Sequence, residues 1–563
     1  MHSRDKNFEV ARLFDEIARS MDMQGEQGHR PRAYRRAARG VAGYQRSIEE
    51  LAADGRLRDI PGVGASLEAL IAEYLATGGM GTHARLVEAH PPGLAPLLLA
   101  RGFGPAAVET LHARTGVTDL DDVERIAREG LLAEAIGPKR AADLVAQLPA
   151  LRNPIRRLRL KTVAELAGEV LDLLGDSGAV YVVGPARRKV DIVEGGLELL
   201  TAAASPADVF VRLPNIDEVL ERTPVHVRLR LYDGLQAHLF IATPESLGAA
   251  LVWHTGSAAH LRRLASLAAQ RGFELAPNIA ARTEEELYGR LDLPWIAPEL
   301  REDQGEIEAA QAGQLPRLVE ERDLQGDMHC HTHWTDGVNS LEQMARAARA
   351  RGYAYMALTD HSRSLAITNG LSLERLEEAR RCVDQLNHEL APFVILLGTE
   401  MDILEDGRLD YPDEVLATLD YVSASIHSRF KQPEAVMTPR ILRAVTHPLV
   451  HTLNHPHGRL LTIRPAYGVD MQRVIEAAAE SGCALEVSGD PARMDLDGGW
   501  ARSAREAGAL CTISSDAHST LDFDNIWLGV GSARRGWLEP KDVLNTRPLD
   551  ELRAVLRRPR STE

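Results

Sequence analysis

The feature that most constrains this chain is the regular alternation of short apolar strands and helices from Asp327 onward. Six strand-like runs recur there, each followed by a helical stretch: "YAYMALTD", "FVILLGTEMDI", "YVSASIH", "HTLNHP", "ALEVSG" and "LCTISSDAH". Repeated strand–helix units favour a parallel sheet, because a helix must carry the chain back before the next strand can start. The pattern predicts either an α/β barrel or a doubly wound sheet.

Polar side chains end these predicted strands. They are Asp360, His361, Glu400, His427, His455, Asp516 and His518. In either fold the loops after the strands converge on one rim, where active sites lie. The run "DMHCHTHWTDG" (327–337) adds His329 and His331, which share one strand face, and Asp336 in a turn. We therefore expect all of these residues to lie near one another.

The set predicts a metal centre. Its candidate ligands are His329, His331, Asp336, His361, Glu400, His427, His455, Asp516 and His518. One tetrahedral ion takes about four ligands, so this set predicts two or three ions, with a carboxylate such as Glu400 bridging. Nitrogen and carboxylate ligands without sulfur suit Zn²⁺, Mn²⁺ or Fe²⁺. A single buried His or Asp is more often a core residue, but the joint pattern favours hydrolysis of a phosphoester.

The motifs of this region resemble, in order, those of the PHP (polymerase and histidinol phosphatase) domain. They are "DMHCHTHWTDG", "LTDHS", "GTEMDI", "SIHSRF", "NHPHGR", "LEVSGDPARMDL" and "SSDAHS". The resemblance implies a distorted (β/α)7 barrel that holds three divalent ions, Mn²⁺ and/or Zn²⁺. It implies one ion on His329, His331, Glu400 and Asp516, a second on Glu400, His427 and His455, and a third on Asp336, His361 and His518.

Five further residues of the region are assigned by their positions. Arg459, in "HPHGR", is the candidate catalytic residue that steadies the phosphate. His333, His451 and His457 fall between ligand positions and are expected to support the ligands or to be exposed. Cys330 points to the strand face opposite its neighbours, so we expect it to be packed.

Residues 1–150 are predicted to form helices joined by short Gly/Pro turns. "IPGVGASLEALIAEYL" places Gly62 and Gly64 before a helix, and "RGFGPAAVETLHARTG" does the same with Gly102 and Gly104. Glycine allows close backbone approach, and a helix N-terminus offers N–H groups to a phosphate. These turns resemble helix-hairpin-helix elements, which bind the DNA backbone without reading sequence. "AIGPKRAADLVAQL" is a weaker third match, and plain helix hairpins are the alternative.

The order of elements along the whole chain resembles the bacterial and archaeal family X DNA polymerases that carry a C-terminal PHP domain. "GHRPRAYRRAAR" resembles their N-terminal domain, and "WHTGSAAHLRR" resembles their nucleotide-site turn, here Thr255, Gly256 and Ser257. Strands are predicted between 178 and 245, at "AVYVVG", "ADVFVRL", "VHVRLRLYDG" and "AHLFIAT".

The implied fold class is multidomain, α + α/β. The expected domains are a helical helix-hairpin-helix domain (1–85), a fingers-like helix-hairpin-helix domain (86–155), a nucleotidyltransferase-like palm (156–245), a thumb with linker (246–318) and the PHP barrel (319–563).

One part departs from that family's pattern. Two of its three catalytic carboxylates form an Asp-x-Asp pair after a Gly-Ser-x-Arg-Arg turn. Here the turn keeps Gly184, Arg187 and Arg188, which we expect to form a vestigial nucleotide site with Thr255–Ser257. Gly195 and Leu197 occupy the aspartate positions, and His238 occupies the third; a shifted register offers Glu194, Glu198 or Asp233 instead. Without carboxylates the metal ions of nucleotidyl transfer are lost, so we expect little polymerase activity.

Charge and cysteine usage bear on partners and location. The formal net charge is −16, but residues 1–160 hold 23 Lys+Arg against 21 Asp+Glu, a net +2. Basic runs in that part can neutralise phosphates locally. The four cysteines form no CxxC pair, and no apolar run reaches the roughly 18 residues of a membrane span. We expect a cytoplasmic, monomeric protein with no membrane partner.

These patterns favour a DNA-repair phosphoesterase, foremost a metal-dependent 3′–5′ exonuclease. Its partner would be DNA with gaps, 3′ ends or abasic sites, and cleavage at abasic sites or removal of 3′-phosphates are related activities. The alternatives are an active gap-filling polymerase whose carboxylates lie in another register, a small-molecule phosphatase and a DNA-binding scaffold.

Overall fold

A computed structural model describes residues 5–26, 29–44, 46–100, 102–152, 157–174, 180–202, 216–231 and 235–557. The chain forms two compact units: Met1–Arg156 with Leu166–Tyr181 and Glu194–Thr243, and Arg157–Glu165 with Val182–Val193 and Pro244–Glu563. The predicted strand "ADVFVRL" (207–213) lies outside the described residues. Within the described ranges, no helix is both long enough and apolar enough to cross a bilayer.

The N-terminal part is helical, as the apolar spacing predicts. Its helices are α1 (Asp5–Met23), α2 (His29–Gly43), α3 (Ile48–Ala53), α4 (Ala65–Thr77), α5 (Gly81–Ala89), α6 (Pro105–Thr115), α7 (Leu120–Arg128), α8 (Leu131–Ile136) and α9 (Pro138–Arg152). Two apolar clusters hold them, one from residues 10–80 and one from residues 94–151 together with Met23. Side-chain caps start two of these helices, Ser47 at α3 and Asp119 at α7.

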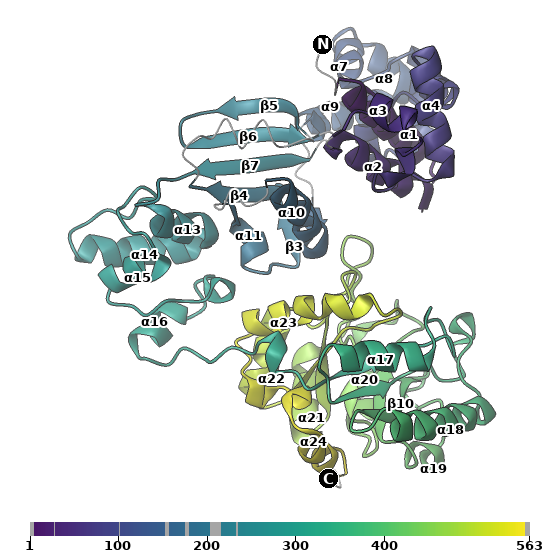
Figure 1. Cartoon of the computed structure of the whole chain (residues 1–563), viewed down its shortest axis with the longest axis vertical. Helices are drawn as coiled ribbons and strands as arrows, with labels where there is room; N and C mark the ends of the chain where they lie inside the picture. The colour runs from purple at the N-terminus through teal and green to yellow at the C-terminus, as the bar shows by residue number, and fades with distance from the viewer. Residues whose placement is uncertain are drawn as a thin grey trace. The chain divides into compact units, whose positions relative to one another are not determined.

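The next part contains a mixed five-stranded sheet in the order β2-β4-β7-β6-β5. The strands are β2 (Val180–Val182), β4 (Leu197–Thr201), β5 (Ile216–Arg222), β6 (His226–Leu231) and β7 (Gln236–Ile241). β4 runs parallel to β7, whereas β5, β6 and β7 pair antiparallel, side by side in Figure 1. A second small sheet pairs β1 (Arg157–Arg159) with β3 (Ile192–Glu194), and the helices here are α10 (Leu160–Leu174) and α11 (Gly184–Arg187).

Four helices follow the sheet: α13 (Leu247–Thr255), α14 (Ala258–Gln270), α15 (Glu284–Arg290) and α16 (Glu306–Gln311). They share an apolar cluster that includes Leu264, Tyr288 and Ile296. The N-cap of α14 is Ser257, whose hydroxyl accepts a hydrogen bond from the N–H of His260.

The C-terminal part is a nearly closed parallel barrel, so of the two folds expected from the strand–helix pattern the barrel is confirmed. Its strands are β8 (Gly326–Cys330), β9 (Tyr355–Leu358), β10 (Val394–Asp402), β11 (Tyr421–Ser425), β12 (Thr452–Leu453), β13 (Ala484–Ser488) and β14 (Cys511–Ser514). They neighbour one another in chain order, and a bridge between Cys330 and Ala517 brings the first and last strands together. Nearly every strand residue is buried, as parallel strands require.

Helices cover the outside of this barrel (Figure 1). They are α17 (Leu341–Ala350), α18 (Leu373–Glu389), α19 (Asp413–Leu416), α20 (Glu434–Val445), α21 (Met471–Ser481), α22 (Gly498–Ala507), α23 (Ile526–Arg535) and α24 (Leu549–Leu556). Caps fix where several begin: Ser340 and Gln343 form a capping box at α17, and Asp497 caps α22. This arrangement leaves the loops after the strands free to build one rim.

Candidate metal centre

A cavity of about 150 Å³ lies at the carboxyl ends of the barrel strands. Its walls are Asp336, His361, Leu365, Thr368, Glu400, His427, His455, Arg493, Asp516 and His518. Most of the residues that we predicted to meet at this rim therefore do meet there. Glu400 lies inside β10 rather than at its end, at the point where β10 leaves β9 and begins to pair with β11.

The first group of side chains comes from β8 and the loop after it, from β10 and from the loop after β14. The Nε2 atoms of His329 and His331 are 3.0 Å apart. Asp516 Oδ1 lies 3.4 Å from His329 Nε2 and 3.2 Å from His331 Nε2. Glu400 Oε2 lies 3.5 Å from His329 Nε2 and 3.6 Å from His331 Nε2. One point among these four side chains is thus within reach of two imidazole nitrogens and two carboxylates.

The other carboxylate oxygen of Glu400 contacts a second group, which contains His427 and His455. Its Oε1 lies 3.3 Å from His427 Nε2 and 2.9 Å from His455 Nε2. Its Oε2 lies 2.9 Å from His361 Nδ1. This carboxylate is the central residue of the set, as expected of a bridging ligand.

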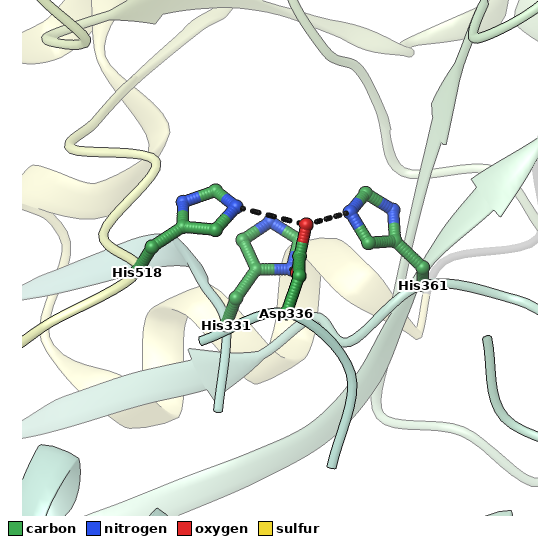
Figure 2. Close-up of side chains that lie close together, drawn as sticks. All are labelled: His331, Asp336, His361 and His518. Atoms are coloured by element: carbon green, nitrogen blue, oxygen red, sulfur yellow. Dashed lines mark ion pairs between the residues drawn. The ribbon is translucent and has the colours of Figure 1, made fainter. Parts of the chain in front are cut away.

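Asp336 centres the third group (Figure 2). Its Oδ2 atom lies 3.4 Å from the Nε2 atoms of both His361 and His518, and the carboxylate stands between the two rings. His331 is beside them, with Nδ1 3.8 Å from Asp336 Oδ1. His331 and His361 each contact two groups, so the three groups form one continuous cluster.

Burial and neighbouring charges set the pKa values in this cluster. Burial, reinforced by two adjacent histidines, lowers the pKa of His331 to about 3, and burial lowers that of His455 to about 4. Burial also disfavours the charged form of His361, but Glu400 and Asp336 outweigh it and raise its pKa to about 10. Burial would raise the pKa of Glu400, yet the surrounding histidines hold it well below its usual range. At neutral pH the carboxylate is therefore ionised, and two rings are neutral with lone pairs to donate.

The donor set fits divalent metal ions. The Nδ1 atom of His331 is buried without a hydrogen-bond partner among the described residues, and an unpartnered buried ring nitrogen is costly unless it binds a ligand. The groups that lie close enough to share an ion are His331–Asp336–His361–His518, His329–His331–Asp516 and His361–Glu400–His427. Nitrogen and carboxylate ligands without sulfur suit Mn²⁺, Zn²⁺ or Fe²⁺.

Two further carboxylates orient the histidines, and the sequence pattern did not single them out. Glu486, in β13, pairs with Nδ1 of His329 at 2.7 Å and accepts the N–H of His455 at 2.7 Å. Asp402, the last residue of β10, pairs with Nδ1 of His427 at 2.7 Å. Such contacts fix which ring nitrogen faces the cavity. The available signal was a charged residue inside the apolar strand "ALEVSG", where an unpaired carboxylate would be costly.

Arg459, which we predicted to contact the phosphate, does not line the cavity, whereas Arg493 does. The guanidinium of Arg459 donates to the main-chain carbonyls of Arg493 and Met494 and pairs with Asp497 at 3.5 Å, so it ties down the loop and does not line the cavity. Arg493 lines the cavity, with Nε 3.5 Å from Asp516 and 3.3 Å from Asp490. Its Nε is buried without a hydrogen-bond partner among the described residues.

The remaining residues of the motifs do not line the cavity, and His451, which we expected to support a ligand or to be exposed, is instead buried. His333 is exposed beside Trp334, and His457 stacks edge-on against Trp500. His451 bonds to the main chain of Val422 and Leu556, away from the cavity. Cys330 is buried in the apolar core of the barrel.

The two Gly-x-Gly turns of the N-terminal part have the same geometry. Gly62 and Gly102 adopt φ values of +87° and +79°, in the left-handed region that glycine tolerates. Gly64 and Gly104 are the N-caps of α4 and α6. A Cβ added to either N-cap glycine meets no atom within 4 Å. Each turn therefore presents an open helix N-terminus, the feature that a phosphate can approach.

The residues expected to form a nucleotide site also lie together. Arg187 Nη1 donates to Thr255 Oγ1 at 2.8 Å, and Arg188 Nη1 donates to Thr255 O at 2.6 Å. Both guanidinium groups are already paired, Arg187 with Glu284 at 2.8 Å and Arg188 with Glu302 at 2.8 Å. Gly184 starts α11, and Gly256 and Ser257 lead into α14.

The positions expected to carry polymerase carboxylates hold none. Gly195 and Gly196 form the bend before β4, and Leu197 is fully buried. His238 lies on β7 directly opposite Glu198 of β4, 3.2 Å from His226. Of the shifted-register alternatives, Glu194 ends β3 and is exposed, and Asp233 lies outside the described residues. The described part of this sheet therefore presents Glu198 beside a histidine, without an Asp-x-Asp pair.

Comparisons with known proteins match three parts of the chain to family models. Residues 5–80 match a helix-hairpin-helix domain, residues 250–302 match the DNA polymerase beta thumb, and residues 327–488 match the PHP domain. The whole chain is similar to the DNA polymerase/3′-5′ exonuclease PolX of Bacillus subtilis (strain 168), with 34% identity over 99% of this chain and 100% of that protein.

The C-terminal part is also similar to shorter proteins. A probable phosphatase of Thermoanaerobacter sp. (strain X514) is 27% identical over 39% of this chain and 89% of its own length. A probable phosphatase of Aeromonas salmonicida (strain A449) is 29% identical over 35% of this chain and 80% of its own length.

Proposed function

Because the chain belongs to the family X DNA polymerases that carry a C-terminal PHP domain, we propose that it is a DNA-binding repair enzyme whose barrel hydrolyses phosphodiesters. Its foremost activity would be that of a metal-dependent 3′–5′ exonuclease. The observation that carries this proposal is the single cavity into which histidines and carboxylates of the barrel converge. Cleavage at abasic sites and removal of 3′-phosphates use the same chemistry and remain related outcomes.

The nine ligands would hold three divalent ions, Mn²⁺ and/or Zn²⁺. His329, His331, Glu400 and Asp516 would hold the first, Glu400, His427 and His455 the second, and Asp336, His361 and His518 the third. When bound, such ions neutralise phosphate oxygens and make a water molecule acidic enough to act as a nucleophile at neutral pH. To bind these ions, the carboxylate ligands must be ionised and the histidine ligands must be neutral, and the protein environment of each side chain sets that state.

Arg493 would bind the scissile phosphate in place of Arg459. Its guanidinium lines the cavity beside Asp516, and its Nε makes no hydrogen bond with a described residue, although the carboxylates of Asp490 and Asp516 lie 3.3 and 3.5 Å away. A planar guanidinium matches two phosphate oxygens at once. Glu486 and Asp402 would keep His329 and His427 turned toward the ions.

The N-terminal part would supply the DNA contact. The paired turns at Gly62–Gly64 and Gly102–Gly104 expose helix N-termini suited to backbone phosphates. The proposed domains are 1–85 and 86–155 for this contact, 156–245 for the palm, 246–318 for the thumb and linker, and 319–563 for the PHP barrel. We propose a cytoplasmic monomer that acts on gapped DNA, 3′ ends or abasic sites.

The polymerase core would be inactive, because Leu197 and His238 stand where carboxylates are needed to hold ions. A gap-filling polymerase is the second candidate function, favoured by the retained cluster of Arg187, Arg188 and Thr255 and by the name of the Bacillus subtilis relative. A small-molecule phosphatase is the third, favoured by the phosphatase relatives of the barrel. The helix-hairpin-helix match argues for DNA over a small substrate.

The test is digestion of a 3′-labelled single-stranded primer with Mn²⁺. His331→Ala and Asp516→Ala should lose at least about 100-fold in rate, the range for removing one electrostatic contact to a developing charge. His333→Ala is the matched control, because its exposed ring lies two residues from His331 but outside the cavity. Full digestion by His331→Ala or by Asp516→Ala would refute the assignment.

A further inference from the structure

The most exposed large apolar side chains of the described residues all lie on loops that follow barrel strands. They are Ile367 (92% exposed), Val338 (78%), Leu521 (75%) and Ile463 (70%). Single exposed apolar residues are ordinary, and a random placement would scatter them over helices and sheet edges. Here they follow β9, β8, β14 and β12, the strands whose loops also carry His361, Asp336, His518 and His455.

Hydrogen bonds connect these loops to the cavity. The N–H of Val338 donates to the carbonyl of His518 at 2.7 Å. The N–H of Thr520, next to Leu521, donates to Asn339 Oδ1 at 3.0 Å, so the two loops are joined at His518 and at Thr520. These bonds hold the loops of Val338 and Leu521 together next to the candidate ligand His518.

The loops that carry the other two residues also reach the cavity. Ile367 lies in the short 3-10 helix Ala366–Thr368, and its neighbours Leu365 and Thr368 line the cavity wall. In the loop of Ile463, the N–H of Leu461 donates to the carbonyl of Ala492 at 2.6 Å, next to the cavity residue Arg493. We define these four residues, Val338, Ile367, Ile463 and Leu521, as the apolar collar.

The size of the cavity limits what can occupy the collar. About 150 Å³ is smaller than the roughly 300–1,000 Å³ of pockets that enclose a drug-sized ligand. A phosphate group fits, whereas the sugar and base attached to it must remain outside, at the rim. A small phosphomonoester would not span four loops, and a protein seated on the collar would close the cavity to its substrate.

We propose that the apolar collar packs against nucleobases on either side of the scissile phosphodiester, which makes these four residues specificity determinants for a nucleic-acid strand. The proposal rests on the phosphodiesterase function proposed above. Aliphatic side chains of this kind insert between bases when a protein unstacks them. The face of a base is apolar and becomes available once the nucleotide leaves its stack, so the collar favours splayed nucleotides over intact duplex.

The test compares two single-stranded oligonucleotides with Mn²⁺, one with ordinary 3′-terminal nucleosides and one with tetrahydrofuran spacers in their place. The measured quantity is the ratio of the two kcat/KM values. The wild-type protein should favour the strand with bases by roughly tenfold, the scale of discrimination that an apolar contact provides. Ile367→Asn with Leu521→Asn should bring the ratio close to one and leave the rate on the spacer strand unchanged.

Two controls match this double variant. Ile367→Val with Leu521→Met keeps the collar apolar and should keep the wild-type ratio. Val225→Asn alters an exposed valine of the turn between β5 and β6, outside the barrel, and should also keep it. A wild-type ratio in the Asn double variant, or a ratio near one in the wild-type protein, would overturn the proposal.

Two further outcomes are distinguishable. If the wild-type protein digests neither strand, the phosphodiesterase function fails, and 2-aminopurine fluorescence at the strand end then decides whether the collar contacts bases. An equal fluorescence change in the wild-type protein and the Asn double variant would reject that contact. If the Asn substitutions instead convert a dimer to a monomer in sedimentation, the collar covers a second copy of the chain and the nucleobase proposal is wrong.

Discussion

Glu486 holds the Nδ1 atom of His329 at 2.7 Å on the side of the ring away from the cavity. The opposite nitrogen, Nε2, is thereby directed at Asp516 and Glu400, 3.4 and 3.5 Å away. One buried strand residue thus decides which nitrogen of His329 can bind an ion. The same carboxylate accepts the N–H of His455 at 2.7 Å, so it positions two candidate ligands at once.

Glu486→Gln should therefore lower metal affinity and nuclease activity by about 10–100-fold, the usual effect of changing a group that orients a metal ligand. The measurement is metal content after dialysis, together with kcat/KM on a single-stranded primer. Glu480→Gln is the control, because that glutamate lies exposed on α21. Unchanged metal content and rate in Glu486→Gln would show that His329 needs no such support.

Arg493→Met should lower kcat/KM on DNA by about 100-fold, since it removes a cation that can contact a charged oxygen in the transition state. Arg493→Lys should recover only part of the rate, because an ammonium group does not offer a planar pair of donors. Metal content should stay at the wild-type level in both variants. A fully active Arg493→Met protein would leave the phosphate without this proposed partner.

Primer extension on gapped DNA with deoxynucleoside triphosphates should give no product. Leu197 is fully buried, and His238 faces Glu198, so the described sheet offers no pair of carboxylates for two ions. The assay is best performed in the Asp516→Ala variant, where the proposed nuclease cannot erase an extended strand. Clear extension there would restore the gap-filling polymerase as the main function.

The stability of the region around Glu284 should depend on pH in the acidic range. Burial would raise the pKa of Glu284, but hydrogen bonds and charges from Arg301 and Arg187 outweigh it and lower the pKa to about 2. A folded-state pKa below the unfolded value contributes stability above about pH 4.5, and the contribution is lost as pH falls toward about 2. Glu284→Gln leaves Arg301 buried without its partner and should cost about 3–5 kcal/mol at neutral pH.

Hydrogen–deuterium exchange of residues 284–301 measures this effect in the full chain. The difference between the wild-type protein and Glu284→Gln should be largest at neutral pH and should shrink between about pH 4.5 and about pH 2. Arg290→Gln is a control on the same helix, because that side chain donates only to a carbonyl and stacks on Phe273. A difference that stays constant through the acidic range would contradict the assignment.

Gly64→Val and Gly104→Val should weaken DNA binding without unfolding the turns. Both glycines have extended φ values, −97° and −93°, and a Cβ at either position meets no protein atom within 4 Å. The added side chain would instead obstruct a phosphate and remove a charged hydrogen bond, which weakens binding by roughly tenfold. The measurement is the Kd and its dependence on salt.

Gly79→Val is the matched control for these variants. Gly79 also has open space around its Cβ position, but it follows α4 rather than preceding a helix in a Gly-x-Gly turn. It should bind DNA as the wild-type protein does. Equal affinities for Gly64→Val, Gly104→Val and Gly79→Val would show that the two turns do not contact the backbone.

The strand–helix pattern was sufficient to predict a parallel α/β fold with a cluster of His, Asp and Glu side chains at one rim, and the resemblance to the PHP domain narrowed that fold to a barrel. Strand periodicity is a local property, and parallel strands in series must bring their carboxyl ends to one rim. His331, Glu400 and Asp516 could therefore be predicted to meet without any knowledge of their contacts. The apolar spacing of α1 and α4 likewise predicted the N-terminal helices.

Only the tertiary structure decided which side chains face the cavity from the loops. Arg459 and Arg493 both follow ligand-bearing strands, yet one guanidinium is held by main-chain carbonyls and the other lines the cavity. The sequence shows that Glu486 lies in an apolar strand, but only the structure shows that its carboxylate contacts His329. The direction of a loop side chain depends on packing between segments far apart in the chain, which no local period encodes. The apolar collar could be recognised only in the same way, from exposure that the folded rim alone determines.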